Sequence, residues 1–224
     1  MDESLKYQIN SAVHSLHIQI GAAEVVIKEA ENFSLESNLK YLSVSDDNGI
    51  LTISEENNTG VTYTNAFLTL YIPADTVFDD ISIMIGAAKM TTGTLSADRV
   101  NLKLGAGDIR IENLSATSQS KIEGGAGKIT IENGTLQNLQ LKMGTGELNL
   151  TASLTGKSDL CLGIGETNLT LIGEKSDYTV EIEKGLGNIS VDGKDVTDFG
   201  VSGNGPNRII IEGGIGAFHL VFEN

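Results

Sequence analysis

The sequence contains no tryptophan, a single cysteine and two prolines, and each scarcity excludes a class of protein. Cys161 alone cannot form an internal disulfide or a zinc site built on several thiolates, so we expect its small side chain to fill a packed position. Aromatic residues make up 5% of the chain, which disfavours a platform that stacks sugar rings. Because proline is so rare, the 26 glycines belong to regular turns rather than to a disordered Pro/Gly tract.

Positive charge is also scarce, because 15 Lys and Arg residues stand against 30 Asp and Glu residues, for a net charge of −15. Such a chain repels phosphate backbones, and no Lys/Arg cluster offsets the repulsion, so we expect no nucleic-acid partner. No apolar segment follows the acidic start at Met1, and no run of apolar residues is long enough to span a membrane. We expect a soluble chain without a transmembrane segment, and whether a leader or anchor precedes Met1 stays open.

An internal repeat of about twenty residues is the strongest pattern in the chain. Each copy alternates apolar and polar residues on both sides of a glycine, which is the period of a strand with one buried face. Copies include NLKLGAGDIRI from Asn101, KIEGGAGKITI from Lys121 and CLGIGETNLTL from Cys161. The glycines predicted to form the corners between strands are Gly21, Gly86, Gly105, Gly125, Gly144, Gly165, Gly185 and Gly214.

This repeat predicts an all-β solenoid in which two strands and a short third segment make one coil, and neighbouring coils pair in parallel. Glycine suits the corners because a positive φ or a close backbone approach there would make a Cβ costly. No stretch shows the apolar spacing of a helix. Two apolar columns are expected to face inward: Ile83, Leu102, Ile122, Leu141, Leu162, Ile182 and Ile211, and Met90, Ile109, Ile129, Leu148, Leu169, Ile189 and Phe218.

Two polar columns alternate in charge from one coil to the next. Opposite charges on adjacent strands attract and like charges repel, so the alternation favours this register over a slip. Each exposed pair contributes only about 0.2–1 kcal/mol, which makes the columns a device for specific stacking rather than bulk stability. The columns are Lys103, Glu123 and Lys142 in one, and Lys89, Asp108, Lys128 and Glu147 in the other.

The chain is predicted to be a single domain, with residues 1–80 forming N-terminal strands and a cap, and residues 81–224 forming the regular coils. Asn48-Gly49 between alternating strands predicts a hairpin, and the segment FLTLYIP predicts a strand that ends at Pro73. Because a solenoid must shield its open ends, we expect the hairpin region and the final strand, with Phe218 and Phe222, to be caps. Residues 192–208 interrupt the repeat and predict an excursion loop, the kind of segment where binding usually occurs.

Calcium chemistry is the first alternative to a purely structural interpretation of the glycine-rich copies, which superficially resemble a calcium-binding nonapeptide roll. The spacing differs from that roll. The position filled by Asp108 holds Lys128 in the next coil, and a lysine at such a site repels Ca²⁺. Later coils carry Glu147, Asn168 and Asn188 at this position. We therefore expect no metal site.

Catalysis is the second alternative, since enzymes that act on polysaccharides gather carboxylates on one face of a β-helix. Here Glu112 and Glu132 stack beside Asn113 and Asn133 at a corner, a pattern more typical of a solvated turn than of an acid/base pair. The histidines, His14, His17 and His219, have no convergent carboxylate in the sequence that would indicate a metal site or a triad. No helix follows the Gly-x-Gly corners to hold a phosphate. We expect no catalytic, cofactor-binding or metal-binding residue.

The opening segment SLHIQIGAAEVVIKEAENFSLE, the hairpin LSVSDDNGILTIS, the segment FLTLYIPADTVFDDISIMIGAAKM and the serial Gly-x-Gly coils together resemble bacterial putative-adhesin domains of unknown function. These are related to the head domains of proposed autotransporter adhesins and to LiaG-like envelope proteins. The resemblance covers nearly the whole chain and implies a right-handed, single-stranded β-helix with a role at the cell surface or in envelope stress. It carries no established catalytic residues. This chain departs from many such relatives in showing no membrane segment.

We therefore expect a non-enzymatic, surface-associated binding or adhesion module, with envelope maintenance as one form of that role. Its partner would be a protein or polysaccharide of the cell surface or envelope, and no cofactor is expected. The cell surface or the extracellular face of the envelope is the expected location, with the cytoplasm as the alternative. A polysaccharide-acting β-helix enzyme and a self-assembling structural scaffold stay open as other functions.

Overall fold

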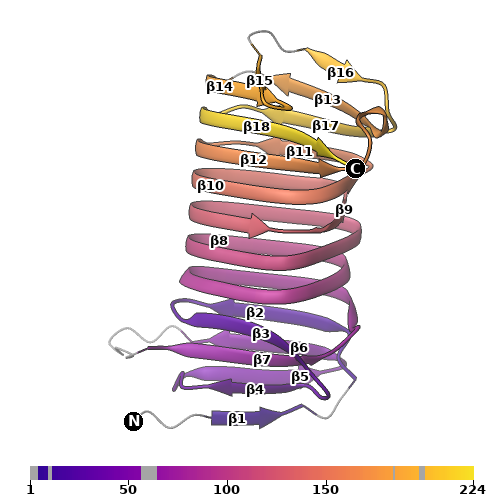
Figure 1. Ribbon diagram of the computed structural model, residues 1–224. Helices are drawn as coiled ribbons and strands as arrows, with labels where there is room; N and C mark the ends of the chain where they lie inside the picture. The colour runs from indigo at the N-terminus through magenta and orange to yellow at the C-terminus, as the bar shows by residue number, and fades with distance from the viewer. Residues whose placement is uncertain (1–4, 10–11, 57–64, 184, 197–199) are drawn as a thin grey trace.

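The computed structural model in Figure 1 describes residues 5–9, 12–56, 65–183, 185–196 and 200–224. Strands dominate these residues, and one short 3₁₀ turn, η1 (Lys175–Asp177), is the only helical element among them. The strands in chain order are β1 (Leu5–Gln8), β2 (Ser15–Ile20), β3 (Glu24–Ala30), β4 (Ser34–Ser37), β5 (Leu42–Asp47), β6 (Ile50–Glu55), β7 (Phe67–Pro73), β8 (Val77–Ile131), β9 (Gly134–Gln137), β10 (Leu139–Thr155), β11 (Lys157–Cys161), β12 (Ile164–Ile172), β13 (Tyr178–Glu183), β14 (Leu186–Val191), β15 (Lys194–Asp195), β16 (Val201–Gly203), β17 (Asn207–Glu212) and β18 (Ile215–Glu223).

The strands form one continuous sheet that winds as a stack of coils (Figure 1). β8 is 55 residues long and runs through several corners without a break. Residues one repeat apart lie side by side in parallel pairs, with Leu141 of β10 opposite Ile122 of β8 and Ile164 of β12 opposite Thr145 of β10. The all-β solenoid predicted from the repeat is confirmed.

The core is a single apolar cluster that fills the inside of the stack from the N-terminal to the C-terminal coils. Alternate residues along each strand point into it because successive side chains of a strand point to opposite faces. The two predicted inward columns are buried with one exception, Leu162, which is only partly buried. Lys103 and Lys142, from one of the predicted charged columns between them, are exposed.

The register predicted for the coil of β11 and β12 is wrong by two residues. Leu160, not Leu162, lies opposite Leu141, and Thr167, not Leu169, lies opposite Leu148. Both Thr167 and Leu169 are buried, so the coil keeps its inward face. The predicted register was aligned on Gly165, but this coil contains another glycine two residues earlier, Gly163, which forms the corner.

The order of the coils in space differs from their order in the chain at both ends. β2 lies between β6 and the start of β8, so the coil of β2 and β3 is inserted below the first regular coil. Likewise β18 pairs in parallel with β12 on one edge and with β14 on the other, so the coil of β17 and β18 is inserted one layer below the end (Figure 1). The prediction that the final strand is a cap is therefore wrong, because both of its edges are already paired.

Antiparallel strands close both ends of the stack. At the N-terminal end β5 and β6 form the predicted hairpin, and Asn48 and Gly49 have the positive φ values, 51° and 77°, that such a two-residue turn requires. At the C-terminal end β15 and β16 pair antiparallel with β14 and β13. These short strands lie within the predicted excursion loop of residues 192–208, whose last two residues belong to β17; its residues 197–199 lie outside the described part of the chain.

Candidate binding surface on the C-terminal coils

A first column of glycines stacks along one edge of the solenoid, where each coil turns from one long strand to the next. A Cβ built on Gly125 would lie 2.3 Å from the carbonyl oxygen of Gly105, and one built on Gly144 would lie 2.4 Å from that of Gly125. Real Cβ atoms do not approach an oxygen this closely, so backbone stacks directly on backbone here. In spatial order the column contains Gly21, Gly86, Gly105, Gly125, Gly144, Gly163, Gly214 and Gly185.

A second glycine column follows two residues later in most coils and has φ values that side chains rarely adopt. Gly127, with φ of 144°, is representative, and Gly165 lies directly opposite Gly146 in this second column. All the predicted corner glycines except Gly165 lie in the first column. Gly163 takes the place that the sequence analysis gave to Gly165.

The residue between the two glycines points away from the core and changes character along the solenoid. It is alanine in the central coils, as at Ala106 and Ala126. In the last three coils it is Ile164, Ile215 and Leu186, which are 55%, 52% and 74% exposed. Ile164 lies opposite Ile215, which lies opposite Leu186, so these three side chains form one line across adjacent strands. We call this line the corner ridge.

The corner ridge does not line a pocket of ligand size. The hollow beneath it, lined by residues such as Leu162, Ile182 and Ile211, is about 30 Å³ in volume. That is roughly the space that one water molecule takes up in the liquid, so no larger ligand enters there. A partner would have to cover the ridge from outside.

Carboxylates border the corner ridge on both sides. Glu166 follows Ile164 by two residues, while Glu212 and Glu183 precede Ile215 and Leu186 by three. Glu212 and Glu183 lie opposite each other on adjacent strands, so two like charges are neighbours here. All of these carboxylates are on exposed residues. The ridge is therefore an apolar line inside a negatively charged border.

Cys161 lies beside this border. Its thiol donates a hydrogen bond to Glu212 Oε2 at 3.1 Å. That hydrogen bond raises the pKa of the thiol, and burial and the charge of Glu212 raise it further. A raised pKa keeps the sulfur protonated and unreactive near neutral pH.

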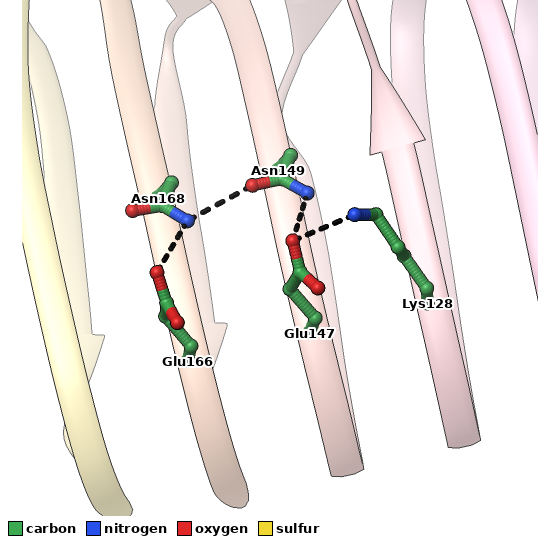
Figure 2. A network of polar contacts seen from close by, with 5 residues as sticks. All are labelled: Lys128, Glu147, Asn149, Glu166 and Asn168. Atoms are coloured by element: carbon green, nitrogen blue, oxygen red, sulfur yellow. Dashed lines mark hydrogen bonds and ion pairs between the residues drawn. The ribbon is translucent and has the colours of Figure 1, made fainter.

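A ladder of polar side chains runs across the outer face of β8, β10 and β12 (Figure 2). Lys128 Nζ lies 2.8 Å from Glu147 Oε1, which also accepts a hydrogen bond of 2.7 Å from Asn149. These two hydrogen bonds lower the pKa of Glu147. Asn168 donates to both Asn149 Oδ1 and Glu166 Oε1, at 2.9 and 3.1 Å. The ladder thus satisfies its own donors and acceptors and ties three coils together.

The structure does not bring the histidines together. His17 contacts Asp80 at 3.1 Å and His14 lies 4.0 Å from Asp79, both near the N-terminal end. His219 lies on β18, in the C-terminal coils, where its Nδ1 is 2.7 Å from the hydroxyl of Ser190. No His, Cys, Asp or Glu side chains of the described ranges form a group of three that could hold a metal ion.

The corner carboxylates of the central coils are engaged in structural contacts. Glu132 forms an ion pair with Arg110, and its backbone N–H donates to the carbonyl of Ile111 in the coil below. Gly134, which follows Asn133, has a backbone N–H that donates to the Asn133 side chain. These contacts give Glu132 and Asn133 roles in the turn.

The sequence analysis missed the corner ridge, although its signal is visible in the sequence. The letters between paired glycines read GAG in two central coils, GTG in the next, and then GIG, GLG and GIG. The repeat was defined by its glycines, so the exposed residue between each pair of glycines was overlooked. The order of the last coils, which makes Ile164, Ile215 and Leu186 neighbours, could not be read from the repeat.

Comparisons with known proteins agree with this architecture. A family profile described as Toastrack DUF4097 matches residues 13–204. A crystal structure described as a putative adhesin from Bacteroides fragilis is similar over 97% of this chain and 96% of its own, with 11% identity and a TM-score of 0.57. A putative cell adhesion protein from Clostridium sporogenes matches over 99% of both chains, with 12% identity and a TM-score of 0.46. At 11% identity the likeness to the Bacteroides fragilis structure shows the fold alone.

No curated protein matches the chain. Across the ranges of the chain that the structure describes, no helix is long and apolar enough to cross a membrane.

Proposed function

The chain belongs to the Toastrack DUF4097 family, and from this premise we propose that it is a non-catalytic module that binds a partner at the bacterial cell surface or envelope. The corner ridge is the observation that carries the proposal. Ile164, Ile215 and Leu186 are aligned and exposed, whereas other aliphatic residues of these strands, such as Leu169 and Leu220, are buried in the core. Aligned apolar groups on an otherwise polar surface are typical of interaction sites.

Energetics support a contact at this edge. Fully burying an Ile or Leu side chain contributes about 1.5–3 kcal/mol, so covering three half-exposed side chains contributes a few kcal/mol in all. The glycine columns continue unchanged through these coils, and Ala106 and Ala126 show that the same corner folds with a small residue. The fold therefore does not require the large side chains.

The carboxylate border indicates the kind of partner. Glu166, Glu183 and Glu212 repel anionic surfaces, as does the overall charge of −15. A protein segment with aliphatic side chains flanked by Lys or Arg would complement both the apolar line and its border. The ridge has no aromatic side chain on which a sugar ring could stack, which favours a protein over a polysaccharide.

The test is a sedimentation assay with bacterial cell-wall, polysaccharide and envelope-protein preparations. It scores the protein retained in the pellet and the saccharide released into solution. The ridge variant combines Ile164→Ser with Leu186→Ser. The matched control combines Val77→Ser with Met84→Ser, which are 65% and 37% exposed and lie at the start of β8.

We expect the envelope-protein preparation to retain the wild-type chain and the control variant, with about tenfold weaker retention of the ridge variant, equivalent to 1.4 kcal/mol. Equal retention of the two variants would contradict the role of the ridge. Release of saccharide would favour the polysaccharide-acting enzyme instead. No retention of the wild type by any preparation would favour the self-assembling scaffold.

A further inference from the structure

A second hollow lies at the C-terminal end of the solenoid and involves none of the ridge residues. Here β15 pairs antiparallel with β14, placing Lys194 opposite Val191, and β16 pairs antiparallel with β13, placing Ser202 opposite Val180. A hollow of about 440 Å³ remains over the last coil. Small-molecule sites typically enclose about 300–1,000 Å³, so this one is large enough for a ligand.

About half of the residues that line the end hollow are apolar. Val180 and Leu220 lie in its lining but are buried members of the solenoid core, each 2% exposed, so the partly exposed lining residues Val191, Val201 and Phe222 offer the contact surface. Val201 forms part of the outer wall and is 62% exposed. The apolar lining residues are Val180, Val191, Val196, Val201, Leu220 and Phe222.

Two lysines lie at the wall of the hollow in a chain that is otherwise strongly acidic. Lys175 Nζ lies 5.4 Å from the centre of the Phe222 ring and 3.8 Å from Asp192. Lys194 forms no ion pair with any residue that the structure describes. The Asp192 carboxylate also accepts a hydrogen bond of 3.2 Å from the Phe222 backbone N–H. Among the described residues that line the hollow, two ammonium groups therefore stand against one carboxylate.

We propose that the end hollow binds a single-chain anionic amphiphile of the fatty-acid class, with the acyl chain against Val191, Val201 and Phe222 and the carboxylate at Lys194. The valine-rich wall suits a flexible hydrocarbon chain. Among the described residues that line the hollow, Ser202 is the only one with a hydroxyl group. The free ammonium of Lys194 selects an anionic head group over a cationic one.

The experiment titrates purified chain with cis-parinarate, a fatty acid whose fluorescence rises in an apolar site, and with its uncharged methyl ester. Val201→Asp places a charge in the acyl site, and Lys194→Glu reverses the charge at the head-group site. Both residues are exposed, so both variants should fold, which thermal unfolding by circular dichroism checks. Val77→Asp, at a residue 65% exposed near the other end, is the matched control.

We expect saturable binding to the wild type. Val201→Asp should weaken both probes about tenfold, and Lys194→Glu should weaken cis-parinarate about tenfold while changing methyl ester binding less than twofold. Val77→Asp and the ridge variant should bind both probes like the wild type. The ridge variant keeps this inference separate from the proposed function, because either can fail alone.

Three results would overturn the assignment. The first is no saturable rise in cis-parinarate fluorescence with the wild type. The second is binding that Val201→Asp leaves unchanged or that Val77→Asp weakens equally. The third is an equal loss of affinity for the acid and for the ester in Lys194→Glu, which would show that the carboxylate does not bind at Lys194.

Discussion

The central coils, residues 97–155, and the last three coils, residues 157–191 and 207–223, share the same glycine columns and buried core but differ in coil order, corner residues and surface charge. In the centre each coil pairs with its neighbour in the chain, the first two corner residues are alanines, and charges are matched, as between Lys128 and Glu147. In the last coils the chain order is interleaved, the corner residues are large, and Glu183 lies opposite Glu212.

This contrast separates what the fold needs from what it permits. Glycine at the corners and apolar residues facing inward occur in both regions, so they are the requirements of the coil. The exposed aliphatic corner residues and the neighbouring carboxylates Glu183 and Glu212 are found in the last coils. The central coils fold without such residues at their corners, so the coil does not require them. Such departures from the repeat mark the surface on which a function can be built.

The largest loss of stability is expected from Gly125→Val in the central coils, because it removes a corner glycine of the kind that both regions require. A Cβ there would lie 2.3 Å from the Gly105 carbonyl oxygen, so we expect the free energy of unfolding to fall by more than about 3 kcal/mol. Gly200→Val is the matched control, since no atom lies within 4 Å of its added Cβ. Thr130→Val, on an outward column, should change stability by less than about 1 kcal/mol. Urea unfolding measures all three, and equal losses would count against the stacked corner.

A smaller effect is expected at the C-terminal end from Tyr178→Phe. The Tyr178 hydroxyl donates a hydrogen bond of 2.5 Å to the Ile172 carbonyl, and the residue is 2% exposed. Losing this partly buried hydrogen bond should cost about 1–2 kcal/mol in the free energy of unfolding. Tyr41→Phe, at a residue 39% exposed, is the control and should cost less than about 0.5 kcal/mol. Similar values for the two variants would show that the last coil does not depend on this contact.

The matched charges of the central coils predict a pH-dependent effect for Glu147→Gln. Hydrogen bonds from Lys128 and Asn149 lower the pKa of Glu147 below its ordinary value of 4.5. Its contribution is therefore present above about pH 4.5 and is lost as the pH falls through the lowered pKa. Because both side chains are partly exposed and screened, we expect at most about 0.5 kcal/mol at pH 7. Urea unfolding at pH 7 and at pH 3 tests this, and a larger loss at pH 3 would contradict it.

The smallest effect is expected from Glu212→Gln beside the ridge. This variant should change the reactivity of the Cys161 thiol and leave the free energy of unfolding unchanged. Glu212 raises the pKa of the Cys161 thiol by accepting its hydrogen bond, so removing the charge should lower that pKa and increase the thiolate fraction. Alkylation by iodoacetamide at pH 8 should become about two- to fivefold faster. Glu183→Gln, on the next strand, should have a smaller effect, and an unchanged rate in Glu212→Gln would contradict the contact.

The sequence predicted the parts of the structure that repeat. Buried positions such as Leu102 and Ile129 followed from alternation, and the hairpin followed from Asn48-Gly49, because local periodicity and turn chemistry determine these features. The register failed at Leu162 because two glycines in one coil, Gly163 and Gly165, fit the corner equally well in sequence. Which of them stacks on Gly144 depends on the neighbouring coil.

The order of the coils in space could not be predicted from the repeat, for a similar reason. Every coil presents equivalent edges, so periodicity does not say whether β18 follows β14 in space or slips between β12 and β14. The line from Ile164 to Leu186 depends on that order. The end hollow depends on it too, because Leu220 and Phe222 reach it only from an inserted β18.

Hydrogen–deuterium exchange on the chain, free and bound to the envelope preparation that retains it, tests most directly whether the last coils are the binding surface. The account predicts slower exchange in the bound state at residues 163–165 and 213–217, with unchanged exchange at the alanine corner of residues 104–107. Protection at residues 104–107 without protection at the two C-terminal corners would contradict it.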